Sequence, residues 1–320
     1  MGVSGLGYVG FAAPDPAQWR QFALDVIGLA PGRVPGAPAY MPQSGARAGE
    51  GADGTQYFRM DDWSWRVAVH PHAENAGLLY MGFEVRGPRE LEEVLARLAA
   101  AGHEARLGTS EEAAGRAVTG IGYTRDPAGN AIELFYGPLI ADVDKFVSPL
   151  GMSFLTGDMG LGHINLFVAD FEASERFYQD MLGFRLTDYY HVGDQMTVNF
   201  YHINPRHHTI GLMKLAPINA VHHVLFEVES VDMVGKALDR AMAAGCKITA
   251  SLGRHSNDNM LSFYMASPFG FEVEIGCDAI RVGPDWTPRF RGPGDVWGHH
   301  GLTAEEIQET AESIKTKEPA

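Results

Sequence analysis

Cysteine is scarce in this sequence, where Cys246 and Cys277 are the only two among 320 residues. Two cysteines cannot build a disulfide framework, so the sequence predicts a fold held by an apolar core and a reducing, cytoplasmic location. Apolar runs that approach the ~18 residues of a membrane-spanning helix are also lacking. Because strand-like sequence begins by Leu6, we expect no secretory leader.

Basic residues are the second shortage. Lysine and arginine number 25 against 40 acidic residues, which gives a formal net charge of -15. Such a surplus of negative charge argues against nucleic acid or an anionic membrane as the partner. The apolar content of 45% and charged content of 20% are ordinary for a globular protein, and the length suggests two domains of ~150 residues each.

An internal repeat is the most informative feature of the sequence. The stretch from Gly7 to Gly28 has its counterpart 155 residues later, from Gly162 to Gly183. A second pair of similar stretches, 80–85 and 223–228, lies 143 residues apart. Each copy begins with a strand-like run and continues into an amphipathic helix and further strands. The chain therefore contains four strand–helix–strands modules, two in each half.

The repeat also predicts the domain boundaries. Residues 1–137 form an N-terminal pair of modules, 138–158 a connector, and 159–282 a C-terminal pair. Residues 283–320 form a C-terminal segment that ends in a helix starting at Thr303. We expect that helix to be solvated or to contact another subunit.

Possible metal ligands interrupt three apolar, strand-like stretches of the second half. His163 lies in the first stretch, His222 and His223 begin the second, and Glu274 lies in the third. Two imidazoles and one carboxylate suit divalent iron with open coordination positions. Glu272 is a rival ligand, because residues two apart share a strand face.

The first half serves as an internal control for these ligands. Tyr8 occupies the position of His163, Tyr80 that of His223, and Glu133 that of Glu274. Only three of the 13 histidines precede residue 160. The same scaffold thus carries both imidazoles in one copy only, which predicts a metal site in the second half. The match of Glu133 to Glu274 favours Glu274 over Glu272.

The chain resembles a known family from Leu6 to His299, most specifically over 252–264 and 268–274. It is similar to the two-domain type I extradiol ring-cleavage dioxygenases of the vicinal oxygen chelate superfamily. Within that family it resembles the enzymes that cleave 2,3-dihydroxybiphenyl and 1,2-dihydroxynaphthalene. The resemblance implies an α+β fold of four βαβββ modules, paired into two half-open barrels with metal only in the C-terminal pair.

The resemblance also implies a function. Enzymes of this kind use Fe(II), with Mn(II) the less expected metal, and O2 to cleave a catechol ring beside its two hydroxyl groups. The implied reaction is extradiol (meta) cleavage of a bicyclic or 3-substituted catechol to a ring-opened 2-hydroxy-dienoate, in aromatic compound degradation. We also expect a homo-oligomer, an octamer or smaller.

Residue roles follow from the same resemblance. The positions that match the iron ligands are His163, His223 and Glu274. The positions that match catalytic groups are His208, an acid–base residue, and His255 and Tyr264, which bind the substrate oxygen. Since His207 is adjacent to His208 and points the other way, we expect one of this pair at the surface.

The resemblance extends to the substrate pocket. The positions that correspond to pocket or bracing residues are Asn165, Phe200, Asn257, Asp258 and Pro293. Asn165 departs from the family, where a small apolar residue is usual, and it shares the strand face of His163. Asn259 is a second departure.

Two other kinds of function stay open at this point. A glyoxalase- or epimerase-type metalloenzyme would use the same scaffold, generally with more carboxylate ligands. A non-catalytic binding member would suit the first half better than the second.

Overall fold

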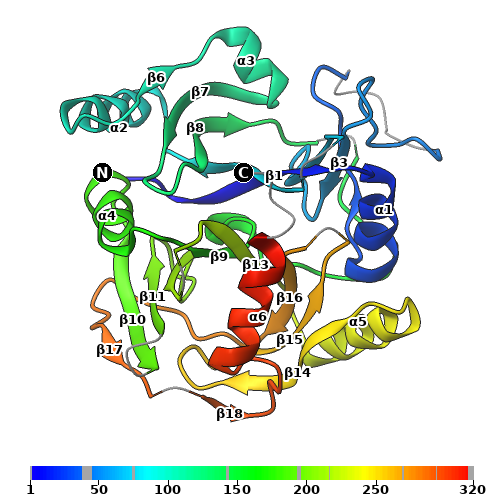
Figure 1. Cartoon of the computed structure of the whole chain (residues 1–320). Coiled ribbons are helices and arrows are strands. Elements are labelled where there is room, and N and C mark those ends of the chain that lie inside the picture. Colours follow the sequence, from blue (N-terminus) through cyan, green and yellow to red (C-terminus); the bar gives the residue numbers. More distant parts are fainter. Residues whose placement is uncertain are drawn as a thin grey trace.

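The computed structural model describes residues 2–37, 45–73, 76–141, 144–192, 196–215, 217–268, 270–292 and 294–315. Two mixed β-sheets dominate it, one from each half of the chain, with helices on their outer sides (Figure 1). None of the helices in these ranges is both long and apolar enough to cross a membrane.

The first sheet is built from two modules. The first module contains β1 (Gly5–Ala13), α1 (Pro16–Gln21), η1 (Phe22–Ile27), β2 (Ala30–Pro31), β3 (Gln56–Arg59) and β4 (Val67–Pro71). The second contains β5 (Gly77–Glu84), α2 (Pro88–Ala100), β6 (Arg106–Leu107), α3 (Ser110–Gly115), β7 (Val118–Arg125) and β8 (Ala131–Pro138). The strand order is β2-β3-β4-β1-β5-β8-β7-β6.

The second sheet repeats this plan after the short helix η2 (Gly157–Met159). The third module contains β9 (His163–Phe167), α4 (Phe171–Arg176), η3 (Phe177–Met181), β10 (Arg185–Val192), β11 (Met196–His202) and β12 (Ile210–Lys214). The fourth contains β13 (Ala220–Glu227), α5 (Val231–Ala243), β14 (Ile248–His255), β15 (Leu261–Ala266) and β16 (Glu272–Cys277).

The two sheets correspond strand for strand. The order in the second is β17-β10-β11-β12-β9-β13-β16-β15-β14-β18, so its inner eight strands match the first sheet. In both, the first strands of the two modules pair antiparallel, and each pairs in parallel with the last strand of its own module. The predicted α+β fold of four βαβββ modules is confirmed.

The same capping residues delimit the first helix of each half. Asp15 and Asp170 cap the helix N-termini, each accepting a hydrogen bond of 3.0 Å from a backbone N–H of the first turn. Gly28 and Gly183 end the helices at φ +89° and +85°, a conformation that side chains disfavour. The sequence repeat therefore specifies where these helices begin and end.

The halves share one apolar core. Phe11 of β1 stacks on Phe271, next to β16, with ring centroids 4.4 Å apart. Tyr178 of η3 donates a hydrogen bond of 2.8 Å to Asp126, which follows β7. The first module thus contacts the fourth and the second contacts the third, which fixes the position of the second sheet.

The C-terminal segment adds strands to both edges of the second sheet. β17 (Arg289–Phe290) pairs with β10, and β18 (Asp295–Trp297) pairs with β14. Helix α6 (Ala304–Lys315) follows Thr303, whose hydroxyl accepts a hydrogen bond from the backbone N–H of Glu306 in the first turn, as the predicted helix start requires. It crosses the open side of this sheet (Figure 1). The expectation of a solvated helix is wrong for one face of it, whereas contact with another subunit stays a prediction. Ile307 and Ala311 are buried among apolar side chains of β9, β11 and β12.

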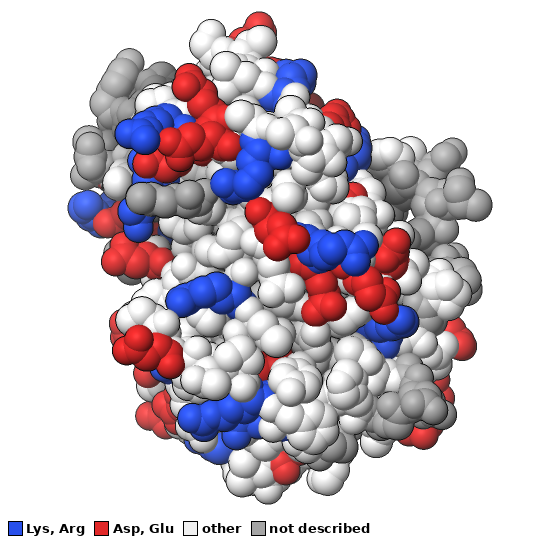
Figure 2. Space-filling model, turned by 90° about the vertical axis from the view of Figure 1, so that its left-hand side faces the viewer, with Lys and Arg blue, Asp and Glu red and all other residues white. Residues whose placement is uncertain are grey.

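Charged side chains are mixed on the outer surface. Figure 2 shows acidic and basic residues side by side on one face of the molecule, with no extended basic area there. This distribution agrees with the low lysine and arginine content.

Candidate metal centre

The three predicted ligands lie on three neighbouring strands. His163 begins β9, His223 is in β13 and Glu274 is in β16, and these strands are adjacent at the centre of the second sheet. The two Nε2 atoms lie 2.9 Å apart, and Glu274 Oε2 lies 3.2 Å from His163 Nε2 and 3.3 Å from His223 Nε2. All three side chains are buried. We call this group the ligand cluster.

The ligand cluster suits a divalent cation. Neither oxygen of Glu274 accepts a hydrogen bond of normal geometry from the described residues, although both are buried. Burial lowers the pKa of His163 to about 4, so its imidazole is neutral and keeps a lone pair. Burial acts to raise the pKa of Glu274, but the neighbouring imidazoles outweigh it and hold that pKa well below its usual value. An anionic carboxylate and neutral imidazoles that face one another are the donors a metal needs.

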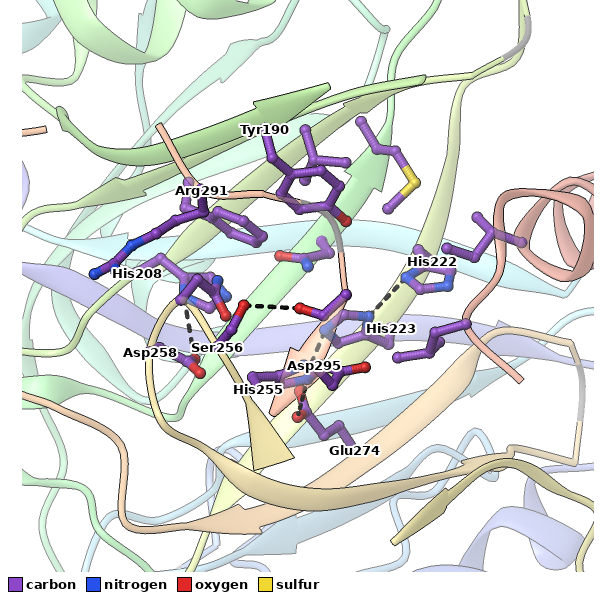
Figure 3. Close-up of a pocket in the computed structure, with 18 of the residues that line it drawn as sticks. Tyr190, His208, His222, His223, His255, Ser256, Asp258, Glu274, Arg291 and Asp295 are labelled. Atoms are coloured by element: carbon purple, nitrogen blue, oxygen red, sulfur yellow. Dashed lines mark hydrogen bonds and ion pairs between the residues drawn. The ribbon is translucent and has the colours of Figure 1, made fainter. Parts of the chain in front are cut away.

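A β-bulge brings a further histidine to the cavity. The pairing of β13 with β9 shifts between Val221 and His223, which leaves His222 as the extra residue. His222 and His223 therefore both line the cavity, although neighbours on a regular strand alternate (Figure 3). Their Nδ1 atoms lie 2.7 Å apart, an outer contact of the kind that orients metal-binding imidazoles. Glu272 lies outside the ligand cluster, 3.6 Å from His222 Nε2.

His255 and Tyr264 lie beside the ligand cluster. His255 Nε2 is 2.8 Å from the Tyr264 hydroxyl and 3.6 Å from Glu274 Oε1. On its other side, His255 Nδ1 donates to Asp295 across 2.6 Å. Burial acts to lower the pKa of His255, but the hydrogen bond to Asp295 and the nearby Glu274 carboxylate prevail and raise that pKa to about 10. A protonated His255 can therefore donate to an anionic oxygen in the cavity.

His208 faces the cavity from the loop between β11 and β12. Its ring stacks on His163 with centroids 3.9 Å apart, and its Nε2 is buried with no hydrogen-bond partner among the described residues. Burial, followed by the neighbouring imidazoles, holds the pKa of His208 well below its usual value. The surface position expected for one histidine of this pair is wrong, because His207 is also buried. Strand alternation does not apply, since both residues lie in a loop.

One cavity contains every predicted site residue that the structure describes. These residues are His163, His223, Glu274, His208, His255, Tyr264, Asn165, Phe200, Asn257 and Asp258. The apolar part of the cavity lining, which we call the distal wall, consists of Val198, Phe200, Met213, Leu302 and Ile307. Pro293 lies outside the described residues.

Two family models match the chain. The model described as "Glyoxalase/Bleomycin resistance protein/Dioxygenase superfamily" matches residues 160–275, and the model described as "Dihydroxybiphenyl dioxygenase BphC D1" matches residues 6–41. The fold alone does not decide the chemistry. A Mn(II)-bound glyoxalase from Novosphingobium aromaticivorans shares the fold with a TM-score of 0.74 at 22% identity.

Matches over nearly the whole chain identify the family. An "Iron-dependent extradiol dioxygenase" from Rhodococcus jostii (strain RHA1) is 37% identical over 93% of this chain and 97% of its own length. A "Biphenyl-2,3-diol 1,2-dioxygenase" from Metapseudomonas furukawaii is 36% identical over 97% and 98%. The chain belongs to the extradiol dioxygenases. The crystal structure of "BphC, a halotolerant catechol dioxygenase" matches this extradiol dioxygenase with a TM-score of 0.84 at 33% identity, covering 94% of this chain and 95% of that one.

The N-terminal half of this extradiol dioxygenase has a cation of its own at the equivalent place. Arg116 donates hydrogen bonds to both oxygens of Glu133, from Nη2 to Oε1 at 2.8 Å and from Nε to Oε2 at 2.9 Å. The hydroxyl of Tyr8 donates to Glu133 Oε2 at 2.6 Å. We call these three residues the arginine-filled site. Because a guanidinium already neutralises the carboxylate there, this site offers a metal neither charge nor space.

Asp295 and His299, which support the site of the extradiol dioxygenase, were missed in the sequence. Asp295 bonds His255, and His299 lies 3.2 Å from Asp295 and 3.1 Å from the hydroxyl of Ser262. Both lie in the Gly- and Pro-rich C-terminal segment, which returns to the site only because β18 pairs with β14. The short apolar run that follows Asp295 was the one available signal of a strand there.

Proposed function

We propose that this extradiol catechol dioxygenase uses Fe(II) and O2 to cleave a bicyclic or 3-substituted catechol beside its hydroxyl groups. The product is a ring-opened 2-hydroxy-dienoate, and both oxygen atoms of O2 enter it. The observation that carries the proposal is the buried ligand cluster at the base of a cavity with an apolar distal wall. Two histidines and one carboxylate are the set with which non-haem Fe(II) oxygenases hold their metal.

His163, His223 and Glu274 would hold the iron. When bound, Fe(II) supplies open coordination positions at which both catechol oxygens and O2 meet, which removes the cost of bringing them together. We assign the proton transfers to His208, because its neutral Nε2 faces the cavity without a protein partner among the described residues. His255 and Tyr264 bind and orient the substrate oxygen on the Glu274 side.

The distal wall supports the substrate class. Phe200 provides an aromatic surface 4.6 Å from the His208 ring, and Ile307 of α6 is buried against the same cluster. An apolar wall of this kind suits a second ring or an aryl substituent. Asn165 adds a polar group to the lining of the same cavity, and its buried Oδ1 has no partner among the described residues.

The test is anaerobic reconstitution of the purified chain with Fe(II), followed by a panel of 3-substituted catechols in air. A yellow ring-opened product and uptake of O2 are expected with Fe(II). Equal turnover with Mn(II) would contradict the assignment of Fe(II) as the metal. The absence of product from every catechol would refute the proposal. Glu274→Ala and Glu272→Ala form a matched pair, because only the first should abolish iron binding. Assembly into a homo-oligomer of up to eight copies belongs to the same proposal and is measured by light scattering.

A further inference from the structure

A buried pair of residues lies behind His208, away from the cavity. His207 Nδ1 is 3.1 Å from His208 Nδ1, and His207 Nε2 is 3.2 Å from Asp188 Oδ2. His207 is 1% exposed and Asp188 is fully buried. Asp188 is on β10, whereas the two histidines are in the loop that follows β11, so the contact depends on the folded sheet.

Asp188 acts only as an acceptor. Arg291 Nε donates to its Oδ2 at 3.0 Å, and the backbone N–H of Arg289 donates to its Oδ1 at 3.2 Å. Both donors come from the C-terminal segment, where β17 pairs with β10 and places Arg289 opposite Asp188. Arg291 lies on the same side of the cavity as His208 (Figure 3). Because each oxygen of Asp188 receives an N–H group that cannot itself accept, the contacts hold Asp188 as a hydrogen-bond acceptor.

The direction of the remaining hydrogen bonds follows from this carboxylate. Because Asp188 can only accept, His207 donates through Nε2–H. With its N–H used at Nε2, the ring of His207 presents Nδ1 to His208 as a hydrogen-bond acceptor. That Nδ1 therefore accepts a hydrogen bond from the Nδ1–H of His208. The tautomer of His208 is thereby fixed, with the proton on Nδ1 and the lone pair on Nε2.

We propose that Asp188 and His207 are positioning residues that hold His208 in the tautomer whose Nε2 accepts a proton from the substrate. In that step the O–H bond of a catechol hydroxyl breaks, its proton joins His208 Nε2, and the electron pair stays on the catechol oxygen. The Nδ1–H bond to His207 remains throughout, so no proton moves along the chain of residues. Asp258 Oδ2 lies farther away, 3.9 Å from His208 Nδ1, and plays a lesser part.

The first experiment reads the tautomer directly. The full chain, labelled with 15N-histidine and loaded with diamagnetic Zn2+, is examined by NMR, and His208 is identified as the signal lost in His208→Gln. An unprotonated Nε2 and a protonated Nδ1 are expected in the wild type. A protonated Nε2 in the wild type would overturn the proposal. Because this measurement needs no turnover, its result does not depend on whether the proposed reaction takes place.

The second experiment asks whether Asp188 acts through His207. Asp188→Asn removes the carboxylate. His207→Phe removes the imidazole between Asp188 and His208 but leaves Asp188 with its arginine partners. Each should lower kcat by about 10- to 100-fold without loss of bound iron, the usual scale for residues that orient an active group. The double variant should be no slower than the slower single variant, because the two residues form one chain.

A matched control separates positioning from general destabilisation. Asp126 is also a buried carboxylate, and it accepts hydrogen bonds from Tyr178 and Asn130 far from the cavity. Asp126→Asn should lower stability but leave both kcat and the His208 tautomer unchanged. The proposal is wrong if Asp188→Asn behaves like Asp126→Asn, or if the Asp188 and His207 losses multiply in the double variant.

Discussion

Replacing Asn165 by valine should change which catechols this enzyme prefers. Asn165 lies on β9, two residues after His163, and lines the distal cavity. Its amide fits there because Gly211 is directly opposite on β12, where an added Cβ would be 2.1 Å from Asn165 Oδ1. That oxygen is buried without a hydrogen bond to any described residue. A substrate with a polar group at this position can pair with the amide, whereas a bare phenyl ring cannot.

The size of the effect follows from the unpaired amide. Leaving a buried polar group without a partner costs about 1–3 kcal/mol. The valine side chain of the Asn165→Val variant has no such group, so binding of 2,3-dihydroxybiphenyl should improve relative to a catechol whose second ring carries a hydroxyl. At about 1.4 kcal/mol per tenfold, the ratio of the two kcat/KM values should shift by about 5- to 150-fold. Steady-state O2 uptake with both substrates measures it.

A nearby apolar change provides the control. Met213→Leu alters the same wall but adds and removes no hydrogen-bonding group, and it should leave the ratio close to that of the wild type. An unchanged ratio in Asn165→Val would refute the reasoning, because it would mean that an ordered water already satisfies the amide.

Four further outcomes are expected. Glu274→Ala should lose stoichiometric iron in metal analysis, whereas Glu133→Gln in the arginine-filled site should keep it. His208→Gln should retain iron but turn over about 100-fold more slowly or worse, and a normal kcat would reassign the proton transfers. Burial opposes ionisation of Asp295, but hydrogen bonds from His255 and His299 lower its pKa to about 2. Ionised Asp295 should therefore add roughly 1–2 kcal/mol, after solvent screening, to the free energy of unfolding above about pH 4. This contribution should be lost as the pH falls toward about 2, so urea unfolding of Asp295→Asn should differ from that of the wild type only at the higher pH. Ile307→Ala should cost about 2–5 kcal/mol of unfolding free energy, and an unaltered urea midpoint would show that α6 does not close the cavity.

Local signals made much of the fold predictable. Asp15 and Asp170 are caps whose side chains bond within their own helix turn, and Gly28 and Gly183 end those helices through their own backbone. Because these signals recur in both halves, the repeat also revealed the modules. The ligand cluster was visible for a similar reason, since a strand that carries an imidazole among apolar residues is unusual in any context.

The missed features depend on contacts between distant parts of the chain. His207 is buried because Asp188 and the C-terminal segment cover its loop, and nothing near it in the sequence indicates this. His222 reaches the cavity through a bulge that exists only in the pairing of two strands. Likewise, Arg116 follows a short helix that has no counterpart among the described residues of the second sheet. Periodicity and spacing describe single elements and cannot reveal such pairings.

The arginine-filled site gives the two halves different requirements for maturation. Its carboxylate receives its counter-charge from the polypeptide itself, so the first sheet is complete as soon as it folds. If Glu274 binds the proposed metal, the equivalent carboxylate of the second sheet receives its counter-charge from an ion of the surroundings. Phe271, three residues before that carboxylate, is already stacked on Phe11 of the first sheet. Under the proposed function, a newly made chain without its metal would therefore have one finished half that holds the other half in register until the metal binds.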